Sequence, residues 1–146
     1  MRWATLAIGA VIALGACNDL REFRGTWQGG RVGEAPAVRV GPGDAAALTI
    51  DGIDSHGLTG RLAIAGLLEE TSVASVEGAE ADALAGLTYS GGPLRVYLAF
   101  VAIPDGAGDA FAVISLYDDH RIEVRILRSG TSPLYGIYVL SDAGGA

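Results

Sequence analysis

Apolar and polar residues alternate in short segments along most of the chain. In the stretch 121–126, Ile122, Val124 and Ile126 occupy every second position and charged residues lie between them. This period of two is typical of a β-strand with one buried face. Further segments that we interpret as strands are 26–32, 38–40, 46–53, 58–65, 71–76, 110–117 and 135–140.

The stretch 94–103 differs because it is apolar on both faces. Tyr97, Val101 and Ile103 fall on one side of an extended backbone, and Phe100 falls on the other. A strand of this kind is expected where both of its faces are covered. We predict that the first set faces outward, where it can meet another chain, and that Phe100 faces an interior cavity.

Turn-forming residues separate the predicted strands. Gly, Pro, Asp and Ser gather in the segments 41–44, 54–57, 90–93, 104–109, 118–120 and 129–133. Short strands with no helical period between them predict an all-β fold, an antiparallel meander of about eight to ten strands. A barrel closes such a meander without exposed edges. The segments 67–70 and 79–85 contain good helix formers, and we interpret 79–85 as a strand.

The first sixteen residues have the layout of a signal peptide. Arg2 is followed by an uncharged, largely apolar run to Ala16. This run is shorter than the roughly 20 residues that a transmembrane helix needs, and it suits an N-terminal signal helix in the precursor. The tetrapeptide that follows Ala13, Leu14-Gly15-Ala16-Cys17, resembles the lipobox of bacterial lipoproteins.

The lipobox resemblance implies three regions. Residues 1–16 would be removed, 17–22 would form a lipidated N-terminus with a short tether, and 23–142 would form the barrel domain. Acyl chains on Cys17 would hold the protein on a membrane of the bacterial cell envelope, since each buried CH2 contributes about 0.8 kcal/mol. The pattern does not distinguish the periplasmic side from the outer-membrane side. The alternatives are an ordinary cleaved signal peptide and an uncleaved anchor.

Composition narrows the functional classes. The 146 residues carry 10 basic side chains, all Arg, and 17 acidic ones, for a net charge of -7. This balance argues against nucleic acid as a partner, and a hydrophobic content of 50% argues against a disordered chain. Cys17 is the only cysteine, so the mature domain has no pair of thiols for a disulfide.

The segment Gly25-Thr26-Trp27 opens the first predicted strand. It resembles the Gly-x-Trp opening of lipocalins and of avidin-like barrels, and it favours a small calycin-like barrel. The resemblance implies that Trp27 closes one barrel end with Arg125 or Arg128 packed across it. The Thr-Asp-Tyr signature of lipocalins is absent. Just before this segment, Asp19 and Glu22 are spaced to cap a short helical turn.

Motifs of catalysis are not found. The chain has no Gly-x-Ser-x-Gly elbow, no phosphate-binding loop with Lys and no His-Glu-x-x-His. His56 and His120 occur in Asp-rich turns, and we interpret them as solvated turn residues. We therefore expect no enzymatic activity, no cofactor and no metal.

Two functional hypotheses follow for a lipid-anchored, non-enzymatic barrel module. In one, it is a lipocalin-like carrier whose cavity holds a small apolar ligand. In the other, the barrel is filled and its outer face binds a protein partner or a second copy of the chain. An envelope enzyme is a third alternative. The residues expected to contact an apolar ligand are Trp27, Tyr89, Phe100, Phe111 and Tyr117.

Overall fold

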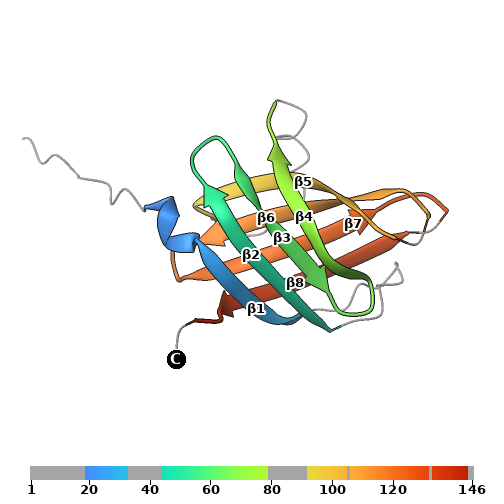
Figure 1. The fold of residues 1–146 in the computed structure, drawn as a ribbon, viewed down its shortest axis with the longest axis horizontal. Coiled ribbons are helices and arrows are strands. Elements are labelled where there is room, and N and C mark those ends of the chain that lie inside the picture. The colour runs from blue at the N-terminus through green and yellow to red at the C-terminus, as the bar shows by residue number, and fades with distance from the viewer. Residues whose placement is uncertain (1–18, 33–43, 79–91, 105, 132, 145–146) are drawn as a thin grey trace, which may run out of the picture.

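The computed structural model describes residues 19–32, 44–78, 92–104, 106–131 and 133–144. Each strand pairs antiparallel with the next, and β1 pairs with β8 to close a barrel (Figure 1). The all-β antiparallel meander is therefore confirmed, with eight strands, and is consistent with a calycin-like barrel. The elements are η1 (Leu20–Phe23), β1 (Gly25–Arg31), β2 (Ala45–Ile53), β3 (Leu58–Ile64), β4 (Leu68–Val76), β5 (Arg95–Ala102), β6 (Asp109–Tyr117), β7 (Arg121–Arg128) and β8 (Leu134–Asp142).

The strand boundaries differ from the predicted ones mainly at β4. This strand begins at Leu68, so the helix formers of 67–70 do not make a helical turn. Leu68 is buried and pairs with Ile64 across a register shift in β3, and this burial outweighs the helical propensity of the segment. The predicted strands 38–40 and 79–85 and the leader 1–16 lie outside the described residues.

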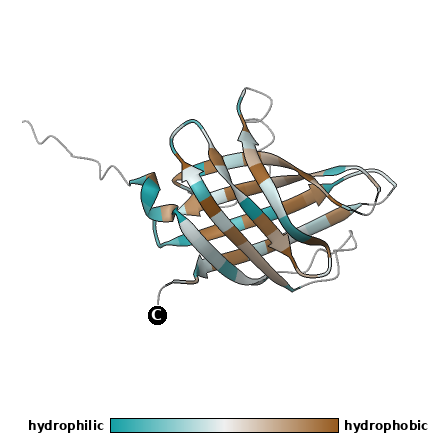
Figure 2. Cartoon of the chain, in the orientation of Figure 1, coloured by the Kyte–Doolittle hydropathy of each residue, from teal (hydrophilic) through white to brown (hydrophobic). Residues whose placement is uncertain are grey.

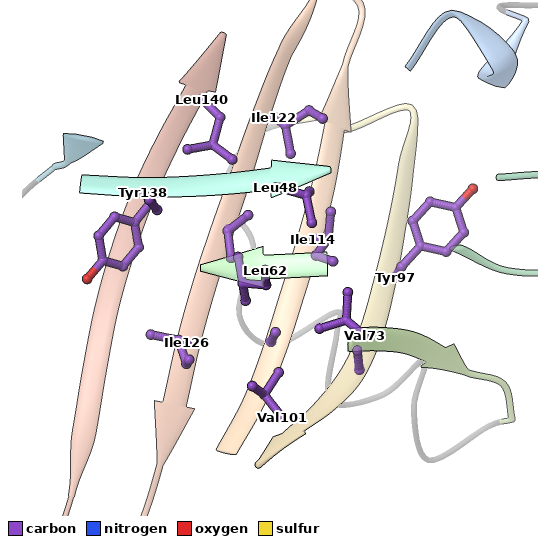
Figure 3. Close-up of a cluster of buried hydrophobic side chains, with 14 of the residues drawn as sticks. Leu48, Leu62, Val73, Tyr97, Val101, Ile114, Ile122, Ile126, Tyr138 and Leu140 are labelled. Carbon is purple, nitrogen blue, oxygen red and sulfur yellow. The ribbon is translucent and has the colours of Figure 1, made fainter. Parts of the chain in front are cut away.

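The interior of the barrel is packed with aliphatic side chains. Hydrophobic and hydrophilic bands alternate along the front strands, as a half-buried strand requires (Figure 2). Figure 3 shows the inward side chains meeting from opposite walls. Barrels of eight strands are just wide enough for side chains to fill. The completely buried ones include Leu48, Leu62, Ile114, Ile122, Ile126 and Leu140.

The predicted faces of the stretch 94–103 are wrong. Tyr97, Val101 and Ile103 belong to the buried core, whereas the Phe100 side chain is 50% exposed. Apolar residues on both faces leave the inward face undefined, since a shift of one residue exchanges the two faces. The Tyr97 ring fits inside because its hydroxyl reaches the barrel end, where it donates a 2.7 Å hydrogen bond to the carbonyl oxygen of Asp54.

Two glycines allow neighbouring strands to approach closely. A Cβ atom at Gly60 would lie 2.0 Å from the carbonyl oxygen of Thr49. A Cβ atom at Gly29 would lie 1.8 Å from the carbonyl oxygen of Val139. No side chain fits at such distances, so these positions require glycine where the small barrel curves.

The barrel has two ends. At the first, which we call the η1 end, η1 precedes β1 and the chain leaves β8. The β2–β3 and β6–β7 turns lie at this end. At the other, the far end, β3 turns into β4 through residues 65–67 and β5 leads into β6. This division places the candidate site described next at the far end.

Candidate functional site

The shortest strand pairing in the barrel is that between β4 and β5. These strands pair only through Ser75 with Ala99 and Val76 with Leu98. By contrast, β5 and β6 pair continuously from Arg95 to Ala102 of β5. Towards the far end the two strands therefore diverge, and we call this part of the barrel wall the β4–β5 seam.

The β4–β5 seam leaves backbone groups without a strand partner. Residues 71–74 of β4 and Leu68 pair with β3 on one side, with a register shift between them, but on the β5 side no described residue pairs with 68–74. In an antiparallel sheet, alternate residues direct both N–H and C=O toward the same neighbour. Alternate residues of 71–74 thus present to the seam backbone groups that no described residue pairs with, as an edge strand does.

A depression opens at the same end of the barrel. Its volume is about 1140 Å³, and half of its lining residues are Ala or Gly, which leave backbone close to the surface. Ala102 and Pro104, at the end of β5, also line it, so it spans the β4–β5 seam. The lining residues of β1 to β4 and their turns are Gln28, Gly29, Ala45, Ala46, Ala47, Ala63, Ile64, Ala65, Gly66, Leu67, Leu68, Glu69, Glu70 and Thr71.

Two acidic side chains, Glu69 and Glu70, line this depression. Glu70 is paired with Arg61 at 2.7 Å, and Arg61 also lies 3.4 Å from Asp51. The exposed carboxylates of Glu69 and Asp109 form no ion pair with any residue that the structure describes. Asp109 pairs through its backbone with Ala102 at the rim. The excess of carboxylates favours a cationic occupant.

An apolar row runs along the outer face of the strands beyond the seam. Phe100 of β5 is opposite Phe111 of β6, and their ring centroids are 4.9 Å apart. Phe111 is opposite Leu127 of β7, which is opposite Tyr135 of β8. The predicted interior position of Phe100 and Phe111 is wrong, because both lie outside the core cluster on the outer face; their contact with a ligand stays a prediction.

The remaining aromatic candidates do not join a common cavity. Trp27 is 1% exposed and lies in the core. Its indole Nε1 donates a 2.9 Å hydrogen bond to the carbonyl oxygen of Phe23, whose ring stacks on the indole. Tyr117 lies beside Arg121, whose guanidinium is 4.0 Å from the ring centroid. Tyr89 and Cys17 lie outside the described residues.

The two arginines that the Gly-x-Trp resemblance places across Trp27 make other contacts in the structure. Arg125 donates to Glu123 on β7, and Arg128 donates to the carbonyl oxygen of Gly108 at the far end. Instead, His120 stacks on Phe23 at 5.9 Å, which adds a second ring over the η1 end of the barrel. Asp19 caps η1 as predicted, since its carboxylate accepts a hydrogen bond from the backbone N–H of Arg21.

The histidines occupy exposed turns. Asp54 accepts hydrogen bonds from the backbone N–H groups of His56 and Gly57, and these bonds lower the pKa of its carboxyl group. His56 lies 3.8 Å from Glu77, and His120 lies 3.8 Å from Glu22. Among the described residues, no three His, Cys, Asp or Glu side chains are grouped as a metal site requires.

The far-end depression was not predicted from the sequence. Its walls are alanines at the ends of strands, such as Ala45, Ala47, Ala63 and Ala65. The clustering of small residues at neighbouring strand ends is the only signal that pointed to it, and small residues are equally common where a barrel simply curves.

Comparison with known proteins gives no relative: no family model, no curated protein and no solved structure matches this chain. Over the part of the chain that the structure describes, no helix has the length and hydropathy needed to cross a bilayer.

Proposed function

We propose that the chain is a lipoprotein of the bacterial envelope whose barrel is a non-enzymatic binding module that recognises a protein partner through its exterior. We place the binding surface on the exterior because the interior is packed with side chains. Leu48, Leu62 and Ile114 are completely buried there, and a ligand could enter only by displacing such side chains.

Anchoring through Cys17 is the second part of the proposal, and it is supported by the lipobox and by the position of the barrel. Only Asn18 and Asp19 separate Cys17 from η1. Since each residue spans at most about 3.5 Å, this tether reaches roughly 10 Å. The η1 end would therefore face the membrane, and the far end would face away from it.

The experiment is labelling of growing bacteria that express the full chain with an alkyne analogue of palmitate. The proposal predicts label in the membrane fraction for the natural chain and none for Cys17→Ser. Binding through the exterior is then tested by affinity capture of cross-linked partners from the natural chain and from a chain with Phe100→Ser at the far end. A chain that is unlabelled contradicts the anchoring, and a chain from which no partner is captured contradicts binding through the exterior. Loss of the captured partners in Phe100→Ser would place them on the apolar outer row.

A second candidate is a carrier of a small apolar molecule. The far-end depression favours it, since a concave and largely apolar site of about 1140 Å³ is of the size that binds small molecules. The ligand would lie at the mouth rather than among the core side chains. Saturable fluorescence of 1-anilinonaphthalene-8-sulfonate at one site per chain, abolished by Ala63→Trp, would support this candidate over a protein partner.

A further inference from the structure

We infer that the β5-facing edge of β4, over residues 68–74, binds an extended cationic peptide segment of a partner protein as an added β-strand. This inference rests on the proposed function, because it names the site and the partner class of the same module. It is carried by the divergence of β4 from β5, by the depression that spans their seam and by the charge around it.

The backbone supplies the affinity of such a contact. Residues 71–74 are held in extended form by continuous pairing with β3, from Thr59 with Ala74 to Leu62 with Thr71, and the start of β4 is held by the pair of Ile64 with Leu68. A preformed strand of this kind loses little conformational freedom when a second strand pairs with it. The N–H and C=O groups along about half of β4 are therefore already held in place for pairing with an added strand.

The depression supplies sites for the side chains of the added strand. Thr71 on β4 and Ala102 on β5 both line it, so the open space lies between the two edges and is not filled by the core. Its small wall residues leave room for side chains of moderate size at every second position of an added strand.

Charge selects the partner. Glu69 and Asp109 are exposed near the two sides of the β4–β5 seam, and neither forms an ion pair with a described residue. The protein as a whole has a net charge of -7. Lysine or arginine in the partner segment would therefore be attracted both over long range and at the seam, whereas an acidic segment would be repelled.

The test uses the full chain, purified from its host membrane in detergent, and a synthetic probe of sequence Lys-Val-Lys-Val-Thr-Val-Lys. Amide hydrogen exchange is measured with and without the probe. In the free protein, alternate amides of 69–74 should exchange faster than those of β6, which is paired on both sides. The probe should bind saturably and slow exchange in 69–74. The same peptide with Glu in place of Lys should not.

Two pairs of variants locate the contact. Glu69→Arg should weaken probe binding by about fivefold or more, the effect of one charge pair at a rim, while Asp118→Arg, an equal charge change at the η1 end, should not. Ala102→Trp should block the seam, while Ala143→Trp at the η1 end should not. Circular dichroism of each variant confirms that it is folded, and emission of the buried Trp27 does so for the two charge variants.

Four results would overturn the inference: slow exchange of all amides of 69–74 in the free protein, no saturable binding of the probe, binding that leaves these amides unprotected, and equal binding of the acidic peptide. Each differs from failure of the proposed function, which is an unlipidated Cys17 or a partner that does not engage the exterior. The exchange measurement is read from the barrel itself and does not depend on lipidation.

Discussion

The carboxylate of Glu123 accepts a 2.6 Å hydrogen bond from Nε of Arg125 on the same strand, β7. The two side chains are only 7% and 13% exposed, so this ion pair is largely buried although it lies on the outer face of the barrel. The pair Glu70 and Arg61 has nearly the same separation, 2.7 Å, but its side chains are 58% and 44% exposed. The two pairs therefore differ in burial rather than in length.

Removing Glu123 should destabilise the fold strongly. Glu123→Ala leaves the Arg125 charge largely buried without this carboxylate, and we expect a loss of about 3 kcal/mol in the free energy of unfolding. Glu70→Ala breaks an exposed pair and should cost less than about 1 kcal/mol. Urea denaturation of the two variants measures both values. Equal losses would contradict the account of the buried pair.

Substitution of Gly29 should be much more damaging than substitution of its neighbour. The Cβ atom of Gly29→Ala would meet the backbone of β8, with the carbonyl oxygen of Val139 only 1.8 Å away. The strands would have to separate, and we expect a loss of about 2 kcal/mol or more. At Gly30 the nearest atom is 3.4 Å away, so Gly30→Ala is the control and should be nearly neutral. Melting temperatures that fall equally would contradict the predicted close approach.

Trp27 should report a dry barrel end. The only other tryptophan, Trp3, lies in the predicted leader, so the mature chain would fluoresce from Trp27 alone. Because its ring is buried, we expect blue-shifted emission that moves to longer wavelength on unfolding. Trp27→Phe removes the hydrogen bond to Phe23 and some packing, and should cost about 2 kcal/mol. Red-shifted emission from the native protein would contradict the placement of Trp27.

Stability should decrease in alkaline solution. Burial raises the pKa values of Tyr97, Tyr117 and Tyr138 above the ordinary value of 10.0. The folded protein then keeps these phenol protons at a pH where the unfolded chain has released them. Their contribution is therefore complete below about pH 10 and is lost as the pH rises through the folded-state values.

Urea unfolding between pH 8 and pH 11, with absorbance at 295 nm to follow phenolate formation, measures this effect. Tyr97→Phe should reduce the slope above pH 10, although it also removes the hydrogen bond to Asp54. Stability that stays constant or rises from pH 10 to pH 11 would contradict the assignment of these tyrosines to buried positions.

The strands could be predicted from the sequence because alternation and turn residues are local signals. In the segment 121–126, for example, only one face is apolar, and its inward residues Ile122, Val124 and Ile126 were identified correctly. The inward face of 94–103 could not be identified, because both faces are apolar. Which face of β5 turns inward is decided by its register with β6, where Phe100 meets Phe111 on the outside.

The β4–β5 seam could not be predicted from local sequence patterns, for a different reason. Whether Val73 of β4 finds a partner in β5 depends on how the tilt and curvature of all eight strands close the barrel. Neither the composition of β4 nor that of β5 records this. Trp27 closes one barrel end, as the local Gly-x-Trp resemblance implied, whereas Phe23, which stacks on Trp27, and His120, which stacks on Phe23, come together only in the fold.

The central claim, a barrel tethered to the envelope by its first mature residue, is tested most directly by intact-protein mass spectrometry of the full chain extracted from a bacterial membrane. The account predicts a protein that begins at Cys17, lacks residues 1–16 and carries the mass of a diacylglycerol with or without a further acyl chain. A mass equal to the bare polypeptide from Cys17, or to the chain with its leader retained, would contradict it.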